Sequence, residues 1–506
     1  MSEKSYQFYV LVFFLFPLIT MLLLLFLRKT EKGVRYLSLS SLVVQLLMTV
    51  FFINYHQTHG WNIFGPIVEI PWIEEWGISL TLGIDGMSFP YILISSILAP
   101  IIYYLMMPLE TNPSIFIRSL LFFLMLFGVY GSFLSLDLVI FYVLWEVVLI
   151  PIFILVGLGT GSLRQSALMK FFLFSLGSSL LMLLGIMILG IHYESQASEL
   201  SFNFFDLKSL VLPVASHEVF LSTQWWTCLA FLLAFFIKAH AFPLHSWLPD
   251  LYKEGTPLAT VVVSALLFNM ATYAMFRFLP AFFPQSIVWW SSILMLLGAL
   301  GIIYGALCVL AQSDLRQVMA FISVSHVGFF LLGFGSLSIM GFQAAYIQTI
   351  NHGILAASFS MLVFLIVHKR NDYHVGSLSG LVKTLPFVTI AFFISILGNI
   401  GLPGTNGFVG EFLVLLASFQ VSPWITAFAA LGVILSATYG LKIFQKLFFN
   451  HAQSIDHDGV VDLKGMQIFV MSILIVFIFL LGIKPMNFFD PAMESLRKTL
   501  IALSLF

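Results

Sequence analysis

The sequence predicts an all-α polytopic membrane protein with about fourteen transmembrane helices. Of its 506 residues, 60% are hydrophobic and only 9% are charged, and the mean hydropathy is +1.03, which lies far outside the range of soluble domains. The apolar runs also reach the roughly 20 residues that a helix needs to cross a bilayer. They are too continuous for a transmembrane β-barrel, whose strands alternate over about ten residues.

The expected spans follow one another with short connections, and two of them are interrupted. Residues 224–245 are broken around Pro243, and residues 384–420 are broken at Pro403-Gly404. Because a break frees backbone groups, its site must lie within protein or beside water. The predicted spans are 8–28, 34–54, 88–107, 117–135, 137–159, 168–192, 224–245, 256–283, 289–311, 315–336, 340–368, 384–420, 423–447 and 465–483.

The two interrupted spans predict an internal repeat. Five-helix units at 117–283 and 284–448 each contain a break in their fourth helix, and an odd number of crossings makes the two units inverted relative to one another. Residues 1–116 then form three preceding helices, and residues 449–506 form a final helix and a tail.

The charges predict an orientation. By the positive-inside rule the more basic set of loops faces the cytoplasm, so that both termini lie on the outer, positive side of a bacterial plasma membrane or an equivalent energy-transducing membrane. The outer set contains only Lys4, Lys208, Lys484, Arg497 and Lys498. The basic set is Arg28, Lys29, Lys32, Arg35, Arg118, Arg164, Lys170, Lys253, Arg316, Lys369, Arg370, Lys383, Lys442, Lys446 and Lys464.

Several classes of function are disfavoured. The net charge is −1 without a basic block, so we expect no nucleic-acid partner. The two cysteines lie within spans, and there is no phosphate-binding loop, dinucleotide fingerprint or cysteine cluster, so we expect no metal or cofactor in this chain. An energy source must come from partner chains or from an ion gradient.

Three ionisable residues interrupt apolar runs, where a charge costs several kcal/mol. They are Glu146, Lys238 and Glu411. Charges of both signs at membrane depth favour an ion path, in which a desolvated lysine beside an acid can take up and release a proton. The structural alternatives are an ion pair for Glu146, a static salt bridge for Lys238 and helix capping for Glu411.

Four histidines extend this set. His240 and His245 flank the first break, and His326 and His352 lie in later spans. Each alone fits a hydrogen-bonding role, whereas together they predict a proton relay, because imidazole titrates near neutrality. The prolines beside His240 and His245 argue against a metal site there.

Two further charged residues have a structural interpretation. Asp137 starts the span that carries Glu146, so it is either a helix cap or an accessory proton carrier. Arg277 lies toward the outer end of its span, where we expect its side chain to snorkel to the surface.

Motifs along nearly the whole chain resemble the antiporter-like proton-pumping subunits of respiratory complex I. Glutamate at 411 is similar to the subunit M, or chain 4, branch of that family, whose sibling subunit L has lysine there. The motifs are Leu82-Gly-Ile-Asp85-Gly86-Met-Ser88, Trp145-Glu146, Lys170-Phe-Phe, Pro243-Leu-His245-Ser-Trp247-Leu-Pro249-Asp250, Asp314-Leu-Arg316, Ser323-Val-Ser325-His326-Val-Gly328, His352-Gly353 and Gly401-Leu-Pro403-Gly404-Thr405.

The resemblance implies a hydrated axis of charged residues, driven by quinone reduction elsewhere in a complex. It pairs Glu146 with Lys238 and links His326 and His352 to Glu411. It also implies NADH, FMN, iron–sulfur clusters and quinone in partner subunits, with neighbouring antiporter-like subunits and the lipid bilayer as the contacts of this chain.

The chain departs from the family pattern in the middle of this axis. Asn269 stands where the family has a second lysine, and His240 stands where it has proline. An amide holds water but carries no net proton charge, so we expect His240 or a water chain to bridge the gap. The alternatives are a cation/proton antiporter of Mrp type, a membrane subunit of an inorganic-carbon uptake or hydrogenase-linked complex, and a spacer that no longer pumps.

Overall fold

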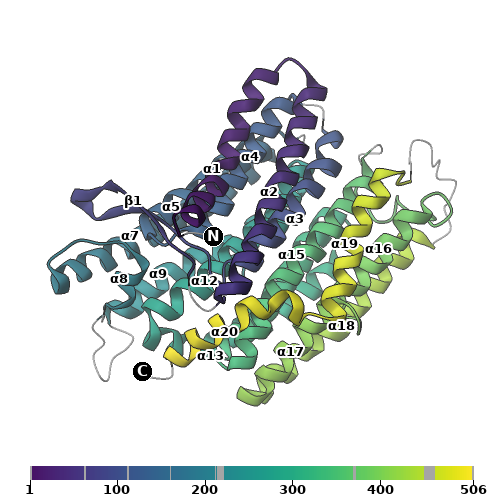
Figure 1. Cartoon of the computed structure of the whole chain (residues 1–506). Coiled ribbons are helices and arrows are strands. Elements are labelled where there is room, and N and C mark those ends of the chain that lie inside the picture. The colour runs from purple at the N-terminus through teal and green to yellow at the C-terminus, as the bar shows by residue number, and fades with distance from the viewer. Residues whose placement is uncertain are drawn as a thin grey trace.

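The chain forms a bundle of helices that are arranged side by side, with one helical pair projecting beyond the rest at one end (Figure 1). The structure is a computed structural model, and it describes residues 3–61, 64–110, 113–159, 161–210, 212, 222–368, 372–449 and 462–503. Lys369 and Arg370 of the predicted basic set lie outside the described residues.

All fourteen predicted spans coincide with helices. Twelve are long and apolar enough to cross a membrane, by length and composition, in the part of the chain that the structure describes. The uninterrupted helices are α1 (Glu3–Leu27), α2 (Glu31–His59), α3 (Phe89–Met106), α4 (Ile115–Leu134), α7 (Arg164–Ala197), α13 (Pro284–Ala311), α14 (Leu315–Gly335), α15 (Ile339–Val367), α18 (Pro423–Phe448) and α19 (Met466–Ile483).

Two more spans are continuous but irregular. One consists of α5 (Leu138–Val147) and α6 (Leu149–Gly157), which follow directly on one another. The other consists of α11 (Pro257–Val262), the π-helical turn η4 (Val263–Leu267) and α12 (Phe268–Phe282). A π-turn inserts one extra residue into a helix and is often found at functional sites.

The two predicted breaks are present. In the first, α9 (Thr223–Lys238) and α10 (Trp247–Glu254) are separated by turns in which His240 has φ 47°. In the second, α16 (Pro386–Asn399) and α17 (Asn406–Val421) are separated by a segment in which Gly401 and Gly404 have φ of 68° and 93°. Only glycine adopts such angles without strain, which accounts for the glycines at this break.

The tail expected after the last span contains a helix that the sequence analysis did not identify. Residues Met486–Leu503 form an eighteen-residue helix, α20, which packs across α3, α12 and α15 and buries one face that includes Phe489, Leu496 and Leu500. Its polar face lowers its mean hydropathy, so a search for continuous apolar runs passes over it. Figure 1 shows α20 crossing the end of the bundle at an angle to the long helices.

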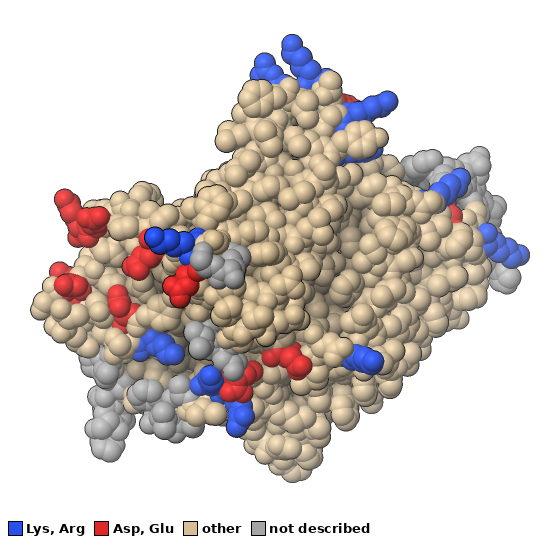
Figure 2. Space-filling view, in the orientation of Figure 1, with Lys and Arg blue, Asp and Glu red and all other residues tan. Residues whose placement is uncertain are grey.

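The sequence analysis also missed small elements outside the spans. Strands β1 (Val68–Ile73) and β2 (Ile78–Leu82) form an antiparallel hairpin around the 3₁₀ turn η1 (Glu74–Trp76), and α8 (Phe204–Lys208) follows α7. A further 3₁₀ turn, η2 (Met107–Leu109), ends α3. The hairpin juts from the flank of the bundle, where acidic side chains are visible (Figures 1 and 2).

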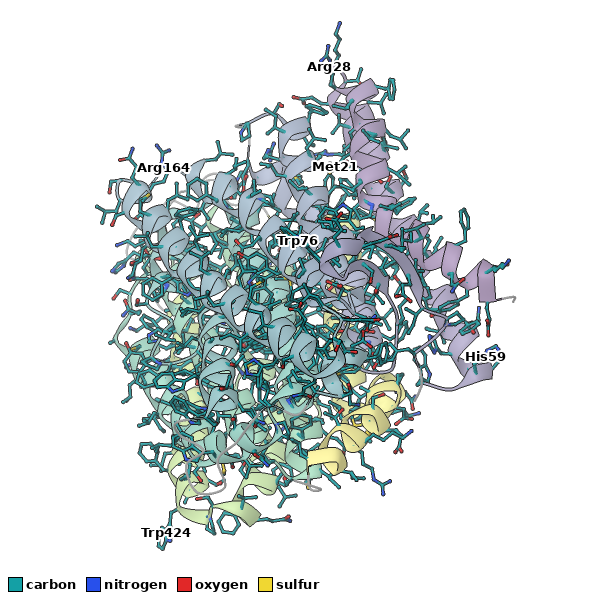
Figure 3. All side chains as sticks on the ribbon, turned by 90° about the vertical axis from the view of Figure 1, so that its left-hand side faces the viewer. Met21, Arg28, His59, Trp76, Arg164 and Trp424 are labelled. Carbon is teal, nitrogen blue, oxygen red and sulfur yellow. The ribbon has the colours of Figure 1, made fainter. Side chains whose placement is uncertain are left out.

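Charged side chains gather at the ends of the helices and leave broad uncharged sides (Figure 2). In the perpendicular view, Arg28 and Arg164 lie at one end of the molecule and Trp424 lies at the opposite end (Figure 3). We call the end with Arg28 and Arg164 the basic side. The central helices α11–α12, α14 and α15 are buried along almost their whole length, so polar groups on them face other helices.

Candidate functional site

The acid and the lysine of the first unit line the same small cavity. Glu146 lies on α5 and Lys238 is the last residue of α9, and both border a space of about 10 Å³ between α5, α7 and α9. The Lys238 ammonium donates a hydrogen bond to the backbone carbonyl of Trp145 at 2.8 Å and lies 3.7 Å from the centroid of the Trp145 ring.

The resemblance implied an ion pair between Glu146 and Lys238, but the ion pairs among the described residues do not include this one. The reason is geometric: α9 ends at Lys238, and the indole and carbonyl of Trp145 satisfy the ammonium there. Glu146 is only half-buried, and its neighbours Val143 and Ile150 on the same helix face are exposed. The carboxylate therefore faces the flank of the bundle.

Three histidines and one glutamate form a buried file through the core. The ring centroids of His240 and His352 are 6.4 Å apart, and those of His352 and His326 are 5.3 Å apart. Nδ1 of His326 lies 3.2 Å from Oε1 of Glu411. We call these four residues the histidine file. They come from the first break, α15, α14 and α17.

His326 has two competing partners at one nitrogen. Its Nδ1 lies 3.2 Å from Glu411 Oε1 and 3.2 Å from Gln348 Nε2. A protonated Nδ1 donates to the carboxylate, whereas an unprotonated Nδ1 accepts from the amide. The two contacts therefore correspond to different positions of a proton on the same ring. The sequence analysis did not identify Gln348, because a glutamine in an apolar helix carries no charge signal.

Several ring nitrogens of the file lack a protein partner. Both nitrogens of His240 and His352 and Nε2 of His326 are buried without a hydrogen bond to any described residue. Buried polar groups almost always have a partner, and ordered water is the usual one where protein supplies none.

The remaining predicted residues take different places. Asn269 is fully buried, donates from Nδ2 to the carbonyl of Ala265 at 3.1 Å, and has an unpartnered Oδ1. His245 packs against Tyr304, with ring centroids 5.1 Å apart, and its Nδ1 has no partner among the described residues. Both residues are thus inside the bundle with unused polar atoms.

Asp137 caps a helix, as its structural interpretation predicted. Its Oδ1 accepts the N–H groups of Val139 and Ile140 at the start of α5, and its Oδ2 accepts that of Ser79. The side chain is 1% exposed, and burial raises the pKa of Asp137 to about 6 despite these hydrogen bonds.

The prediction that Arg277 snorkels was wrong. Its guanidinium is buried and binds both carboxylate oxygens of Asp85, with Nη1 2.9 Å from Oδ2 and Nη2 2.5 Å from Oδ1, and its Nε donates to the Tyr273 hydroxyl. Asp85 belongs to the segment before α3, 192 residues away in sequence. An arginine near the end of a span is expected at the membrane interface unless an acidic partner is known. Here the partner is far away in sequence, so the sequence alone does not indicate it.

No three His, Cys, Asp or Glu side chains meet in an arrangement that could hold a metal ion within the described ranges. The buried carboxylate, imidazole and ammonium groups can exchange protons with one another or with water.

Comparison with known proteins identifies the family. Residues 135–436 match the family described as NADH:quinone oxidoreductase/Mrp antiporter, transmembrane. The chain is 32% identical to NADH-quinone oxidoreductase subunit M of Escherichia coli K12, over 83% of this chain and 82% of that one. It is also 32% identical to F(420)H(2) dehydrogenase subunit M of Methanosarcina mazei, over 94% of both chains.

Solved structures give the same result. A chain of respiratory complex I from Thermus thermophilus with bound NADH superimposes with a TM-score of 0.84 at 29% identity, covering 97% of this chain and 99% of that one. The Mrp complex from Dietzia shares the fold, with a TM-score of 0.82 at 20% identity over 99% of this chain and all of that one. The resemblance that the motifs predicted is confirmed, and the chain belongs to the NADH:quinone oxidoreductase/Mrp antiporter transmembrane family.

Proposed function

We propose that the chain is a proton-translocating membrane subunit of a quinone-reducing dehydrogenase complex, with the redox chemistry in partner chains. The histidine file carries this proposal. Four titratable side chains follow one another through the centre of the bundle, and their spacing is short enough for one water molecule to bridge each gap between rings.

His326 supplies a switch between two hydrogen-bonded states. When its Nδ1 carries a proton, that nitrogen donates to Glu411, and when the proton leaves, the same nitrogen accepts from Gln348. Glu411 on α17 then holds the transferred proton at the far end of the file. Thus each transfer leaves His326 with a partner.

His240 fills the gap in the middle of the axis. Asn269 carries no exchangeable charge, whereas neither ring nitrogen of His240 has a partner among the described residues, and its ring centroid lies 6.4 Å from that of His352. Lys238 is two residues before His240, so the imidazole lies between the first unit and the rest of the file. We infer that His240 relays protons between Lys238 and His352.

Glu146 couples this chain to a neighbour. Its carboxylate is half-buried, forms no ion pair with any described residue, and shares a cavity lining with Lys238. An acid on an adjoining membrane subunit that gained or lost a proton would change the charge state favoured at Glu146 and then at Lys238. We propose neighbouring antiporter-like subunits as the partners on this flank.

The test of the relay is His240→Leu in the assembled complex, reconstituted in liposomes, with protons translocated per quinone reduced as the measurement. We expect a loss of roughly 10–100-fold in translocation, the usual effect of removing a proton-transfer group. A matched control is His56→Gln, at a buried histidine of α2 that hydrogen-bonds to Tyr6. Normal translocation by His240→Leu would show that this ring carries no protons.

The identity of the driving module has its own test. Two relatives with equal identity are named for different electron donors, so the donor is a property of the partner chains. Gentle purification from the native membrane should bring an inhibitor-sensitive, NADH-oxidising and quinone-reducing assembly with this chain. Isolation with non-redox partners alone would instead indicate an antiporter of the Mrp type.

A further inference from the structure

A large polar cavity opens on the basic side of the bundle. It has a volume of about 560 Å³ and lies where the segment after α3 meets the starts of α11 and α14. Its charged and titratable lining residues are Glu110, Lys253, Glu254, Asp314, Arg316, His368, Asp372 and His374. Asp314 and Arg316 already form an ion pair, and Glu254 accepts the N–H of Leu163, so these three side chains have a structural role.

Glu110 differs from these three side chains. Its Oε1 accepts the N–H of Leu258 at the start of α11, at 2.9 Å, but its Oε2 is buried without a partner among the described residues. Burial raises the pKa of Glu110 above its usual range, although the Leu258 N–H and the nearby Arg118 act in the opposite direction. A buried carboxyl group with one free oxygen that borders a polar cavity can exchange protons with water there.

From Glu110, polar side chains continue inward along a single helix. Thr256 is the buried N-cap of α11, and Thr260, Ser264 and Asn269 are buried on the α11–η4–α12 helix. The first three are four residues apart, which places them on one face. The step from Ser264 to Asn269 is five residues, and the π-turn η4, with its i→i+5 hydrogen bonds, keeps them on that face. An uninterrupted α-helix would turn Asn269 away from the other three.

Two of the four side chains on this stripe have protein partners: Thr256 Oγ1 accepts the N–H of Ala259, and Ser264 Oγ donates to the carbonyl of Val261. Oγ1 of Thr260 and Oδ1 of Asn269 are buried without a partner in the described part of the chain. The Tyr252 hydroxyl lies beside the hydroxyls of Ser264 and of Ser323 on α14. Groups of this kind, in a row, have the composition of a site that holds a file of water molecules.

The stripe ends at the histidine file. A Cβ placed on Gly353 would lie 2.8 Å from Nδ2 of Asn269, so the amide touches the backbone next to His352. Only glycine permits this contact. The polar stripe and the histidine file therefore meet at the turn of α15 that carries His352.

We propose that protons reach the histidine file from the basic side through Glu110 and water held by Thr256, Thr260, Ser264 and Asn269. This inference rests on the proposed function, since it assigns the uptake path of the same relay. In this path Asn269 orients water and need not carry charge. Glu110 collects the proton, and His352 is its first acceptor inside the core.

The test compares two nearly isosteric changes in the assembled, reconstituted complex. Thr260→Val removes one hydroxyl from the stripe. Its matched control, Thr389→Val, removes a buried hydroxyl of α16 that donates to the carbonyl of Leu385. We expect Thr260→Val and Glu110→Gln to lower protons translocated per quinone reduced by roughly 10-fold or more, and Thr389→Val to leave that ratio unchanged.

A Glu411→Gln variant separates the two proposals. If it abolishes translocation while Thr260→Val and Glu110→Gln translocate normally, the uptake path is wrong and the proposed function stands. If all three variants translocate normally, both are wrong. A loss of translocation in Thr260→Val that Thr260→Ser restores would support a role for the hydroxyl itself.

Water access gives a measurement that does not depend on activity. The cysteine of a Thr260→Cys variant should react with 2-aminoethyl methanethiosulfonate, a small cationic thiol reagent, added from the basic side. We expect this reaction to be at least several-fold faster than that of a Thr389→Cys variant. Labelling of the parent protein gives the background. Equal rates at the two positions would overturn the proposed path even if pumping fell.

Discussion

The buried pair of Asp85 and Arg277 gives the sharpest energetic prediction. Their side chains are 7% and 5% exposed, and two hydrogen bonds join them, so little solvent screens the interaction. Arg277→Met keeps the length of the side chain but leaves the carboxylate buried and uncompensated, which should cost about 3–5 kcal/mol in the free energy of unfolding. Asp85→Asn should cost a similar amount, because it leaves the guanidinium without a counter-charge.

The double variant Asp85→Asn, Arg277→Met distinguishes this account from simple loss of packing. It removes both charges together, and an asparagine oxygen still accepts the Ser88 N–H that Asp85 accepts at 3.0 Å. We expect it to be more stable than the sum of the single changes by roughly 2–3 kcal/mol. The assay is unfolding of the protein in mixed detergent and sodium dodecyl sulfate micelles. Single variants within about 0.5 kcal/mol of the parent, or strict additivity, would refute the reasoning.

Three further changes test other parts of the structure. Glu411→Gln keeps the shape of the side chain beside His326 but removes its charge, so proton translocation should fall roughly 100-fold in an assembled complex; unchanged translocation would exclude this acid from the path. Gly86→Ala places a Cβ 1.7 Å from the carbonyl oxygen of Pro491, so α20 must shift, and amide hydrogen exchange in α20 should accelerate; unaltered exchange would show that the contact is not needed. For Asp137 the folded pKa of about 6 exceeds the ordinary 3.8, so the folded state binds the proton more tightly, and the free energy of unfolding should fall by about 3 kcal/mol as pH rises from 3.8 to 6. Asp137→Asn should flatten this pH dependence of the free energy of unfolding. The same pH dependence in the variant and the parent would contradict the prediction.

The spans and breaks were predictable because each depends on local composition. Continuous apolar runs predict helices, and Pro243, Pro403 and Gly404 mark the two places where a helix is interrupted. The amphipathic α20 left a weaker signal, since its buried Phe489, Leu496 and Leu500 recur at helical spacing among polar residues. A search for this period after the last apolar run would have found it.

The site was predictable in its members but not in its contacts. An ionisable group inside an apolar run can be seen in sequence, so Glu411 and His326 were identified, but their 3.2 Å approach depends on how α14 packs against α17. The same limit applies to Lys238, whose ammonium contacts the carbonyl and the ring of Trp145 and does not form an ion pair with Glu146 among the described residues. The five-helix repeat boundaries, the side of the termini and the roles in proton transfer stay predictions.

The position of Glu146 has a consequence for the life of the newly made chain. Its half-exposed carboxylate would face hydrocarbon in a subunit that has not found its neighbours, at a cost of several kcal/mol. In an unassembled copy, α5 is the helix that carries this cost. Assembly relieves the strain by covering this flank. Surplus copies that never find a neighbouring subunit should therefore be less stable in the bilayer than assembled ones.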